Sequence, residues 1–172
     1  TPDKIAVHTP SSGFAEGYLF AFLRASSAFN RILGPFFGFD QLWSPDGSKI
    51  IVSATNRGCR TPEITIVDAS GKFLSNPEIR TIAEKCAWHT VKIVYCAIPR
   101  DLDAQDVWPD QYLRGEINTA DQLVRIDLDA QKKDEILNEG SFDMTNLLIT
   151  KDQKILFFVN RTDGTRWRVS IQ

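Results

Sequence analysis

A four-residue pattern, Lys-Ile followed by two apolar residues, recurs along this chain at intervals that fit one structural repeat. The copies are KIAV at 4–7, KIIV at 49–52, KIVY at 92–95 and KILF at 154–157, so the steps are 45, 43 and 62 residues. The last interval contains an inserted segment, about 99–120, whose removal would bring the step close to the other two. A period of this size is typical of repeat proteins in which each unit is one supersecondary structure.

Each copy of the pattern is expected to be the second strand of a hairpin. Before KIIV, Pro45-Asp46-Gly47 predicts a tight turn, because proline fixes φ, aspartate bonds to its own backbone and glycine adopts the left-handed conformation. Third strands are predicted at 18–22, 63–69, 122–130 and 165–171, most of them alternating apolar and polar residues. Fourth strands are predicted at 29–33, 79–83 and 134–138, and first strands at 38–42 and 141–145.

Four antiparallel strands repeated every 43–45 residues predict an all-β fold built of β-propeller blades. A generic β-sandwich is the alternative, but it does not require the same residues at a fixed period. The blades are expected at about 1–37, 38–83, 84–138 and 139–172, with an apolar connection, GPFFGF, at 34–39. This order gives two complete and two partial blades in a single domain. We therefore expect a half or C-terminal portion of a propeller, whose open ends a second copy could close.

Composition narrows the function classes. The 172 residues are 42% hydrophobic and 24% charged with a net charge of −2, which gives no electrostatic argument for nucleic-acid binding. No apolar run approaches the roughly 20 residues that span a bilayer, and no export signal or anchor is recognisable within the chain. Three cysteines are too few for a disulfide scaffold. Cys86 and Cys96 flank one turn and are either a cross-strand disulfide or two small buried side chains.

The sequence predicts no catalytic residues, no metal ligands and no cofactor. It lacks the G-x-S-x-G nucleophile motif, paired histidines or cysteines at metal-binding spacing, and a glycine-rich phosphate loop. Asp40 and Asp143 begin innermost strands at equivalent places and are expected to accept hydrogen bonds from backbone N–H groups near the central channel. A metal-dependent propeller hydrolase or lactonase is the alternative, because such enzymes gather carboxylates at that channel.

Candidate binding residues lie in the connections expected at the mouth of the propeller. The arginines there are Arg57, Arg60, Arg100, Arg114 and Arg161. Guanidinium groups recognise carboxylates and sugar-phosphates, although arginine is also common in exposed loops without a binding role. Trp108 and Tyr112 stand in the polar insertion, where large aromatic side chains either pack back against the blades or contact a partner.

On WSPDGSKI, VYCAIPRDL and KILFFVNRTDGTRWRVSI, the chain resembles the TolB-like bacterial β-propellers with WD-repeat-like PDG hairpins, and most closely the uncharacterised exported members. The resemblance covers nearly the whole chain and departs from TolB at the insertion. It implies a non-catalytic binding or scaffold module for protein–protein or glycan interactions in the bacterial envelope, in the periplasm or at the cell surface. A purely structural spacer is a further alternative, and the expected partner is a protein or a second copy of the chain.

Overall fold

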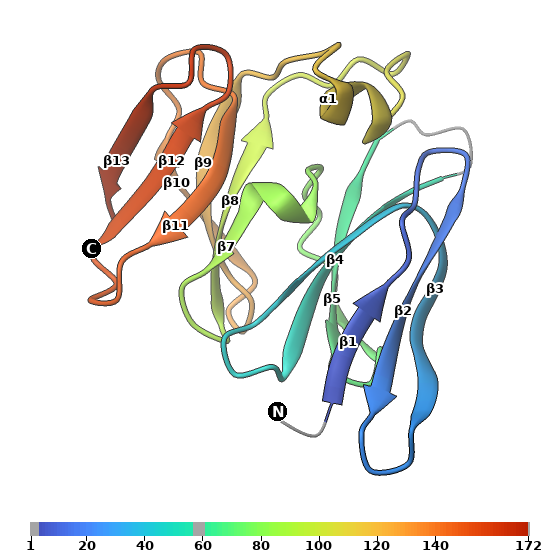
Figure 1. The fold of residues 1–172 in the computed structure, drawn as a ribbon. Helices are drawn as coiled ribbons and strands as arrows, with labels where there is room; N and C mark the ends of the chain where they lie inside the picture. Colours follow the sequence, from blue (N-terminus) through green and yellow to red (C-terminus); the bar gives the residue numbers. More distant parts are fainter. Residues whose placement is uncertain (1–3, 57–60, 172) are drawn as a thin grey trace.

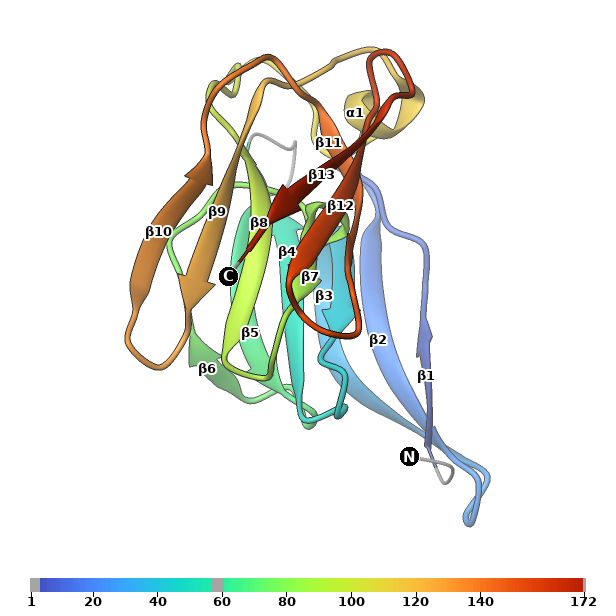
Figure 2. The ribbon, with the colours of Figure 1, turned by 90° about the vertical axis from the view of Figure 1, so that its left-hand side faces the viewer.

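The computed structural model describes residues 4–56 and 61–171, and its strands form three antiparallel sheets that stand side by side (Figures 1 and 2). The first sheet has the order β1-β2-β3-β4-β5-β6. Its strands are β1 (Lys4–His8), β2 (Glu16–Leu23), β3 (Ala28–Trp43), β4 (Lys49–Thr55), β5 (Glu63–Asp68) and β6 (Phe73–Ser75). Blade one is β1, β2 and the first half of β3, and blade two is the second half of β3 with β4, β5 and β6.

The other two sheets are blades three and four. Blade three has the order β10-β9-β8-β7, and blade four has the order β11-β12-β13. Their strands are β7 (Cys86–Trp88), β8 (Ile93–Pro99), β9 (Asp121–Asp127), β10 (Lys132–Leu137), β11 (Met144–Ile149), β12 (Ile155–Asn160) and β13 (Arg166–Ser170). A 3-10 helix, η1 (Ala83–Lys85), precedes β7, and a short helix, α1 (Asp110–Arg114), lies in the insertion. The predicted all-β class, with two complete and two partial blades, is confirmed.

The apolar segment 34–39 connects blades one and two, as the sequence suggested, but it does so as part of a strand and not as a loop. Strand β3 runs through it without a break, pairing with β2 in its first half and with β4 in its second. The strand bends at Gly34, whose φ is +106°, where a Cβ atom would lie 2.6 Å from the carbonyl oxygen of Gly17. Only glycine fits this close backbone approach. Because β3 pairs with both β2 and β4, the first two blades share one continuous sheet.

The predicted fourth strand of blade two, at 79–83, is wrong. The fourth strand is β6, because a tight turn returns the chain onto β5 immediately after Asp68. The Asp68 carboxylate accepts the N–H groups of Ser70 and Lys72, and Gly71 adopts a φ of +88°. The apolar residues at 79–83 are instead buried beside the blade. Strand β11 likewise begins three residues later than predicted.

The Lys-Ile pattern marks the second strands but does not keep one register. The hairpins close through N–H groups of Ser44, His89 and Thr150 on the carbonyls of Lys49, Ile93 and Ile155, respectively. Lys49 is therefore equivalent in the structure to Ile93 and Ile155. The sequence pattern instead matches Lys49 with Lys92 and Lys154, one residue earlier in each strand. Because side chains alternate between the two faces of a strand, this offset exchanges the faces on which matching residues lie.

Apolar clusters fill the spaces between successive blades. Blades one and two meet through Leu19, Leu33, Ile50, Val52 and Val67. Blades two and three meet through Ile51, Ile64, Ile66, Val94, Cys96 and Val124. Blades three and four meet through Tyr95, Ala97, Leu123, Met144, Leu156 and Phe158. Each fully buried side chain of this kind contributes roughly 1.5–3 kcal/mol, so the contacts between neighbouring blades hold the stack together.

The turn at Pro45-Asp46-Gly47 offers a direct test of the hairpin geometry. Asp46 Oδ1 accepts hydrogen bonds from Ser44 Oγ at 2.7 Å and from Ser48 N and Oγ at 3.0 and 2.9 Å. Bonds to the charged form lower the pKa of Asp46 from 3.8 to about 2. We expect NMR titration of the Asp46 carboxyl carbon to give that midpoint, and Ser44→Ala to raise it. The associated stability is present above the ordinary pKa and is lost as pH falls through about 2. A midpoint at 3.8 in the unmodified protein would contradict the geometry.

Candidate functional site

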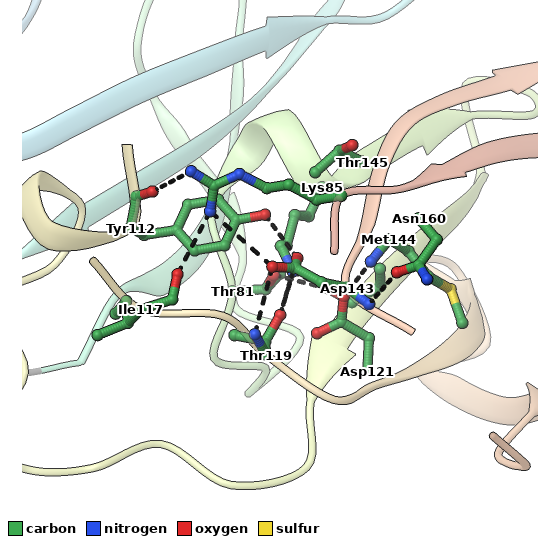
Figure 3. Close-up of polar contacts among 12 residues, drawn as sticks. Thr81, Lys85, Tyr112, Ile117, Thr119, Asp121, Asp143, Met144, Thr145 and Asn160 are labelled. Carbon is green, nitrogen blue, oxygen red and sulfur yellow. Dashed lines mark hydrogen bonds and ion pairs between the residues drawn. The ribbon is translucent and has the colours of Figure 1, made fainter. Parts of the chain in front are cut away.

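A buried polar cluster ties the insertion to blades three and four (Figure 3). The Lys85 side chain is fully buried, and its Nζ donates to Thr119 Oγ1 at 2.6 Å, Asp121 Oδ2 at 2.6 Å and Asp143 Oδ1 at 2.8 Å. The Tyr112 hydroxyl donates to the same Asp143 oxygen at 2.7 Å. These bonds use all three ammonium donors, and the side chains of Lys85, Asp121 and Asp143 are fully buried. The cluster therefore anchors the insertion and is closed to a ligand.

The charges of the cluster nearly balance. Arg161 Nη1 lies 3.9 Å from Asp143 Oδ2. Two cations, Lys85 and Arg161, therefore face the two carboxylates of Asp121 and Asp143. Burial raises the pKa of Asp143, but the charge of Lys85 and the hydrogen bonds from Lys85, Tyr112 and Thr119 outweigh it and hold that pKa below its ordinary value. For Asp121 burial prevails over Lys85, and its pKa is raised. Burial, reinforced by the bond to Asp143, raises the pKa of Tyr112, which keeps its hydroxyl protonated as a donor.

Trp108 and Tyr112 pack against the body of the protein. They are 1% and 2% exposed, and their rings stack with centroids 5.0 Å apart. The Arg161 guanidinium lies over the Tyr112 ring at 4.2 Å from the centroid. Of the two alternatives for these aromatic residues, the structure has the packed one, and neither ring is presented to a partner.

The three candidate arginines that the structure describes each have hydrogen-bond acceptors within the chain. Arg57 and Arg60 lie outside the described residues. Arg100 donates to Asn138 Oδ1 at 2.8 Å and to the Gly140 carbonyl at 2.9 Å. Arg114 pairs with Glu116, and Arg161 donates to the carbonyls of Tyr112 and Ile117. These three side chains are thus held by different acceptors, and Arg114 remains 56% exposed in its pair with Glu116.

A cavity of about 560 Å³ opens among the inner strands of the blades. Its wall joins His8 at the end of β1, Asp40 on β3, Glu84 on η1 and Asn146 on β11. Apolar side chains complete it, including Leu42, Leu113 of α1 and Leu147. The insertion therefore forms part of the rim, and side chains from all parts of the blade stack meet in one space.

Two carboxylates give this cavity an acidic character. Asp40 Oδ1 accepts the N–H of Gln41 at 2.8 Å, and its Oδ2 accepts the N–H of Glu84 at 3.0 Å. Burial raises the pKa of Asp40, and its backbone hydrogen bonds oppose the rise only in part. Loss of hydration, followed by repulsion from Asp40, raises the pKa of Glu84. Two neighbouring carboxylates that repel each other are a favourable receptor for a cationic group.

A disulfide joins Cys86 and Cys96, which lie directly opposite each other on β7 and β8 with Cα atoms 4.1 Å apart. Of the two alternatives for these cysteines, the structure has the disulfide. Cys86 also lines the inner cavity, so the bond braces the strand that carries part of its wall.

A second, larger space lies between the outer parts of blades two and three, with a volume of about 670 Å³. Its wall carries both signs of charge, namely Glu63, Glu78, Glu135, Arg80, Arg100 and Lys133. Because these charges are intermixed, the crevice selects no single ligand chemistry, and we place the candidate site at the inner cavity.

Neither metal ligands nor a membrane span is found in residues 4–56 and 61–171. No group of three His, Cys, Asp or Glu side chains there is placed to hold a metal ion. Within the same ranges, no helix has the length and apolar character needed to cross a bilayer.

Sequence reasoning missed Lys85, Asp121 and Glu84. A weak signal existed for Lys85, since it stands in the otherwise apolar run IAEKCAW, where a charged residue requires a partner. Nothing in the sequence pairs it with Asp121 or Asp143, which are 36 and 58 residues away. Glu84 had no signal, because an exposed glutamate between strands is ordinary.

Similar solved structures show the fold. Kuenenia stuttgartiensis hydrazine synthase matches 98% of this chain and 49% of its own, with a TM-score of 0.65 and 16% identity. TolB from Acinetobacter baumannii matches 98% of this chain and 41% of its own, with a TM-score of 0.57 and 15% identity. An oligogalacturonate lyase in complex with manganese matches 96% of this chain and 51% of its own, with a TM-score of 0.56 and 13% identity.

The chain spans about half the length of each of these structures or less. No protein-family model and no curated protein sequence matches it. Identities this low carry the fold and not the activity. By its sheets and by these similarities, the chain is built of β-propeller blades.

Proposed function

We propose that this chain is a non-catalytic binding module whose recognition site is the inner cavity, and whose partner is a protein that inserts a basic side chain. The observation that carries the proposal is the pair Asp40 and Glu84 in a cavity with apolar walls. A lysine or arginine side chain suits such a site, because its stem packs on apolar surface while its head bonds to carboxylates.

A rigid rim supports this proposal. Leu113 projects from α1, and α1 is held by the buried Tyr112 and by the cluster around Lys85. Binding sites built on restrained elements lose little conformational freedom when a ligand binds. A glycan partner is less favoured, because sugar recognition uses exposed aromatic rings and both aromatic residues of the insertion are buried.

An enzyme is the alternative, since two of the similar structures are a hydrazine synthase and an oligogalacturonate lyase. Metal analysis of the purified protein separates the two proposals. One equivalent of tightly bound calcium, manganese or zinc that is lost in Glu84→Gln would favour a metal-dependent hydrolase or lyase over a binding module.

We also propose that the protein acts outside the cytoplasm of a bacterium. The Cys86–Cys96 bond supports this, because disulfides persist mainly in oxidising compartments. Alkylation of free thiols in intact cells before lysis, followed by mass spectrometry, tests it. Alkylated Cys86 and Cys96 would contradict the proposal.

The binding proposal predicts the chemistry of selected ligands. Panning a displayed peptide library against the chain should enrich peptides that contain lysine or arginine. Glu84→Gln should raise the Kd of a selected peptide about tenfold or more, because one carboxylate is lost to a charge-assisted bond. Glu135→Gln, which removes an exposed carboxylate on the outer strand β10, is the matched control and should leave the Kd unchanged.

Acidification gives a second readout of the same site. Because the pKa values of Asp40 and Glu84 are raised, both carboxylates take up protons at a higher pH than ordinary ones do. Peptide binding should therefore weaken as pH falls, beginning above the ordinary carboxylate range, and Glu84→Gln should shift that profile. Selected peptides without basic residues, or equal binding by Glu84→Gln, would contradict the proposal.

A further inference from the structure

We infer that two copies of this chain dock head to tail, with blade four of each packed on blade one of the other, so that their inner cavities join into one channel. This contact does not depend on the basic-side-chain ligand proposed above. It uses surfaces at the two ends of the blade stack, and the experiment below separates it from ligand binding.

Inside the chain, each blade has two apolar faces, one for each neighbour. On β4, Ile50 belongs to the cluster with blade one, whereas Ile51 belongs to the cluster with blade three. On β8, Val94 belongs to the cluster with blade two, whereas Tyr95 belongs to the cluster with blade four. We call the face that a blade turns toward the next blade its onward face, and the face that it turns toward the preceding blade its backward face. Each of these contacts between blades joins the onward face of one blade to the backward face of the next.

Blade four has the same two-faced pattern, but its onward face is uncovered. Leu156 and Phe158 point back into the cluster with blade three, and Phe157 lies between them on the other face. When the strands are aligned by the hydrogen bonds that close their hairpins, Phe157 is equivalent to Ile51 and Tyr95. Ile51 and Tyr95 are 0% and 1% exposed, whereas Phe157 is 38% exposed. Its cross-strand neighbours are Leu148 on β11, which is 64% exposed, and the exposed Arg168 on β13.

Blade one is uncovered on its backward face. Leu19 points into the cluster with blade two, so Phe20 and Phe22, the alternate residues of β2, lie on the opposite face. Val7 pairs with Phe20 and is 40% exposed, and Phe29 pairs with Phe22 and is 62% exposed. The rings of Phe22 and Phe29 pack together with centroids 4.9 Å apart and form an apolar surface, which Arg31, the partner of Phe20 on β3, borders.

A second copy is the partner that matches both faces. Within the chain, an onward face packs on the backward face of the next blade. The uncovered onward face of blade four therefore fits a backward face, and blade one has one uncovered. Two copies, each with two complete and two three-stranded blades, place eight blades in one ring, within the four to eight blades of closed propellers, and closure covers both faces. Two identical contacts related by a two-fold axis complete the ring.

The inner cavity supports closure. His8 comes from blade one and Asn146 from blade four, and both line the same cavity although they lie at opposite ends of the blade stack. In the proposed dimer, the two half-rings face each other, and the two cavities open into one shared channel.

Sedimentation velocity with light scattering across a dilution series tests the inference. The unmodified chain should have twice the mass of one copy. Phe157→Glu and Val7→Glu should each raise the dissociation constant of the dimer about 100-fold or more, because each places a charge in both contacts. Phe73→Glu is the matched control: Phe73 is 60% exposed on β6, away from both end faces, and its substitution should leave the dimer intact. Leu148→Glu and Phe29→Glu provide a second pair of variants should either of the first fail to fold.

The two variants also report the orientation of the contact. A dimer that joined blade four to blade four would be lost in Phe157→Glu and kept in Val7→Glu, which would overturn the head-to-tail arrangement. A monomeric unmodified chain at every concentration would overturn the inference altogether and leave further blades of a longer chain as the occupant of both faces. Peptide binding by monomeric Phe157→Glu tests the proposed function separately, because Asp40 and Glu84 belong to one copy.

Discussion

Replacing Lys85 by methionine is expected to lower the free energy of unfolding by about 3–5 kcal/mol. The substitution removes the ammonium group from two carboxylates with fully buried side chains, Asp121 and Asp143, and leaves both without their nearest counter-charge. Urea unfolding followed by tryptophan fluorescence measures the change. The matched control is Lys92→Met, which breaks an equally short but exposed ion pair with Asp129 and should leave the free energy of unfolding nearly unchanged.

The pH dependence of the Lys85→Met variant has a definite sign. Without the ammonium, burial raises the pKa values of Asp121 and Asp143 above those of the unfolded chain. A buried carboxyl with a raised pKa stabilises the fold below its unfolded pKa, and that contribution is lost as pH rises through the folded pKa. Lys85→Met should therefore recover part of its stability on mild acidification, relative to the unmodified protein. A loss below about 1 kcal/mol with no such recovery would show that water reaches the cluster.

Loss of the Cys86–Cys96 bond is the second large effect, expected to lower the free energy of unfolding by about 2–3 kcal/mol. The bond joins residues 10 apart and restricts the unfolded chain, and loops of this length give stabilisation of that order. The measurement compares urea unfolding of the unmodified protein with that of Cys86→Ala/Cys96→Ala. The control is a reducing agent added to both proteins. It should destabilise the unmodified protein and leave the stability of the double variant unchanged. Equal stability of both proteins without reductant would contradict the prediction.

Much of the fold follows from features that act over short distances. The step of 43–45 residues and the turn at Pro45-Asp46-Gly47 predict hairpins and their repetition, because turn chemistry and strand alternation depend on neighbouring residues. The segment 79–83 shows the limit of this reasoning. Its apolar residues resemble a strand, but the side-chain hydrogen bonds of Asp68 bring the chain back earlier, and β6 takes the fourth place.

By itself the sequence determined the all-β class, the blade repeat and the position of the insertion, since each depends on local pattern. Tertiary structure alone decided that Trp108 and Tyr112 are buried and that Lys85 meets Asp121 and Asp143. It also placed Asp40 beside Glu84, 44 residues further along the chain. The physical reason is that burial and charge pairing depend on which distant strands become neighbours. That is set by the packing of whole blades and by a one-residue offset in register, which the Lys-Ile pattern does not record.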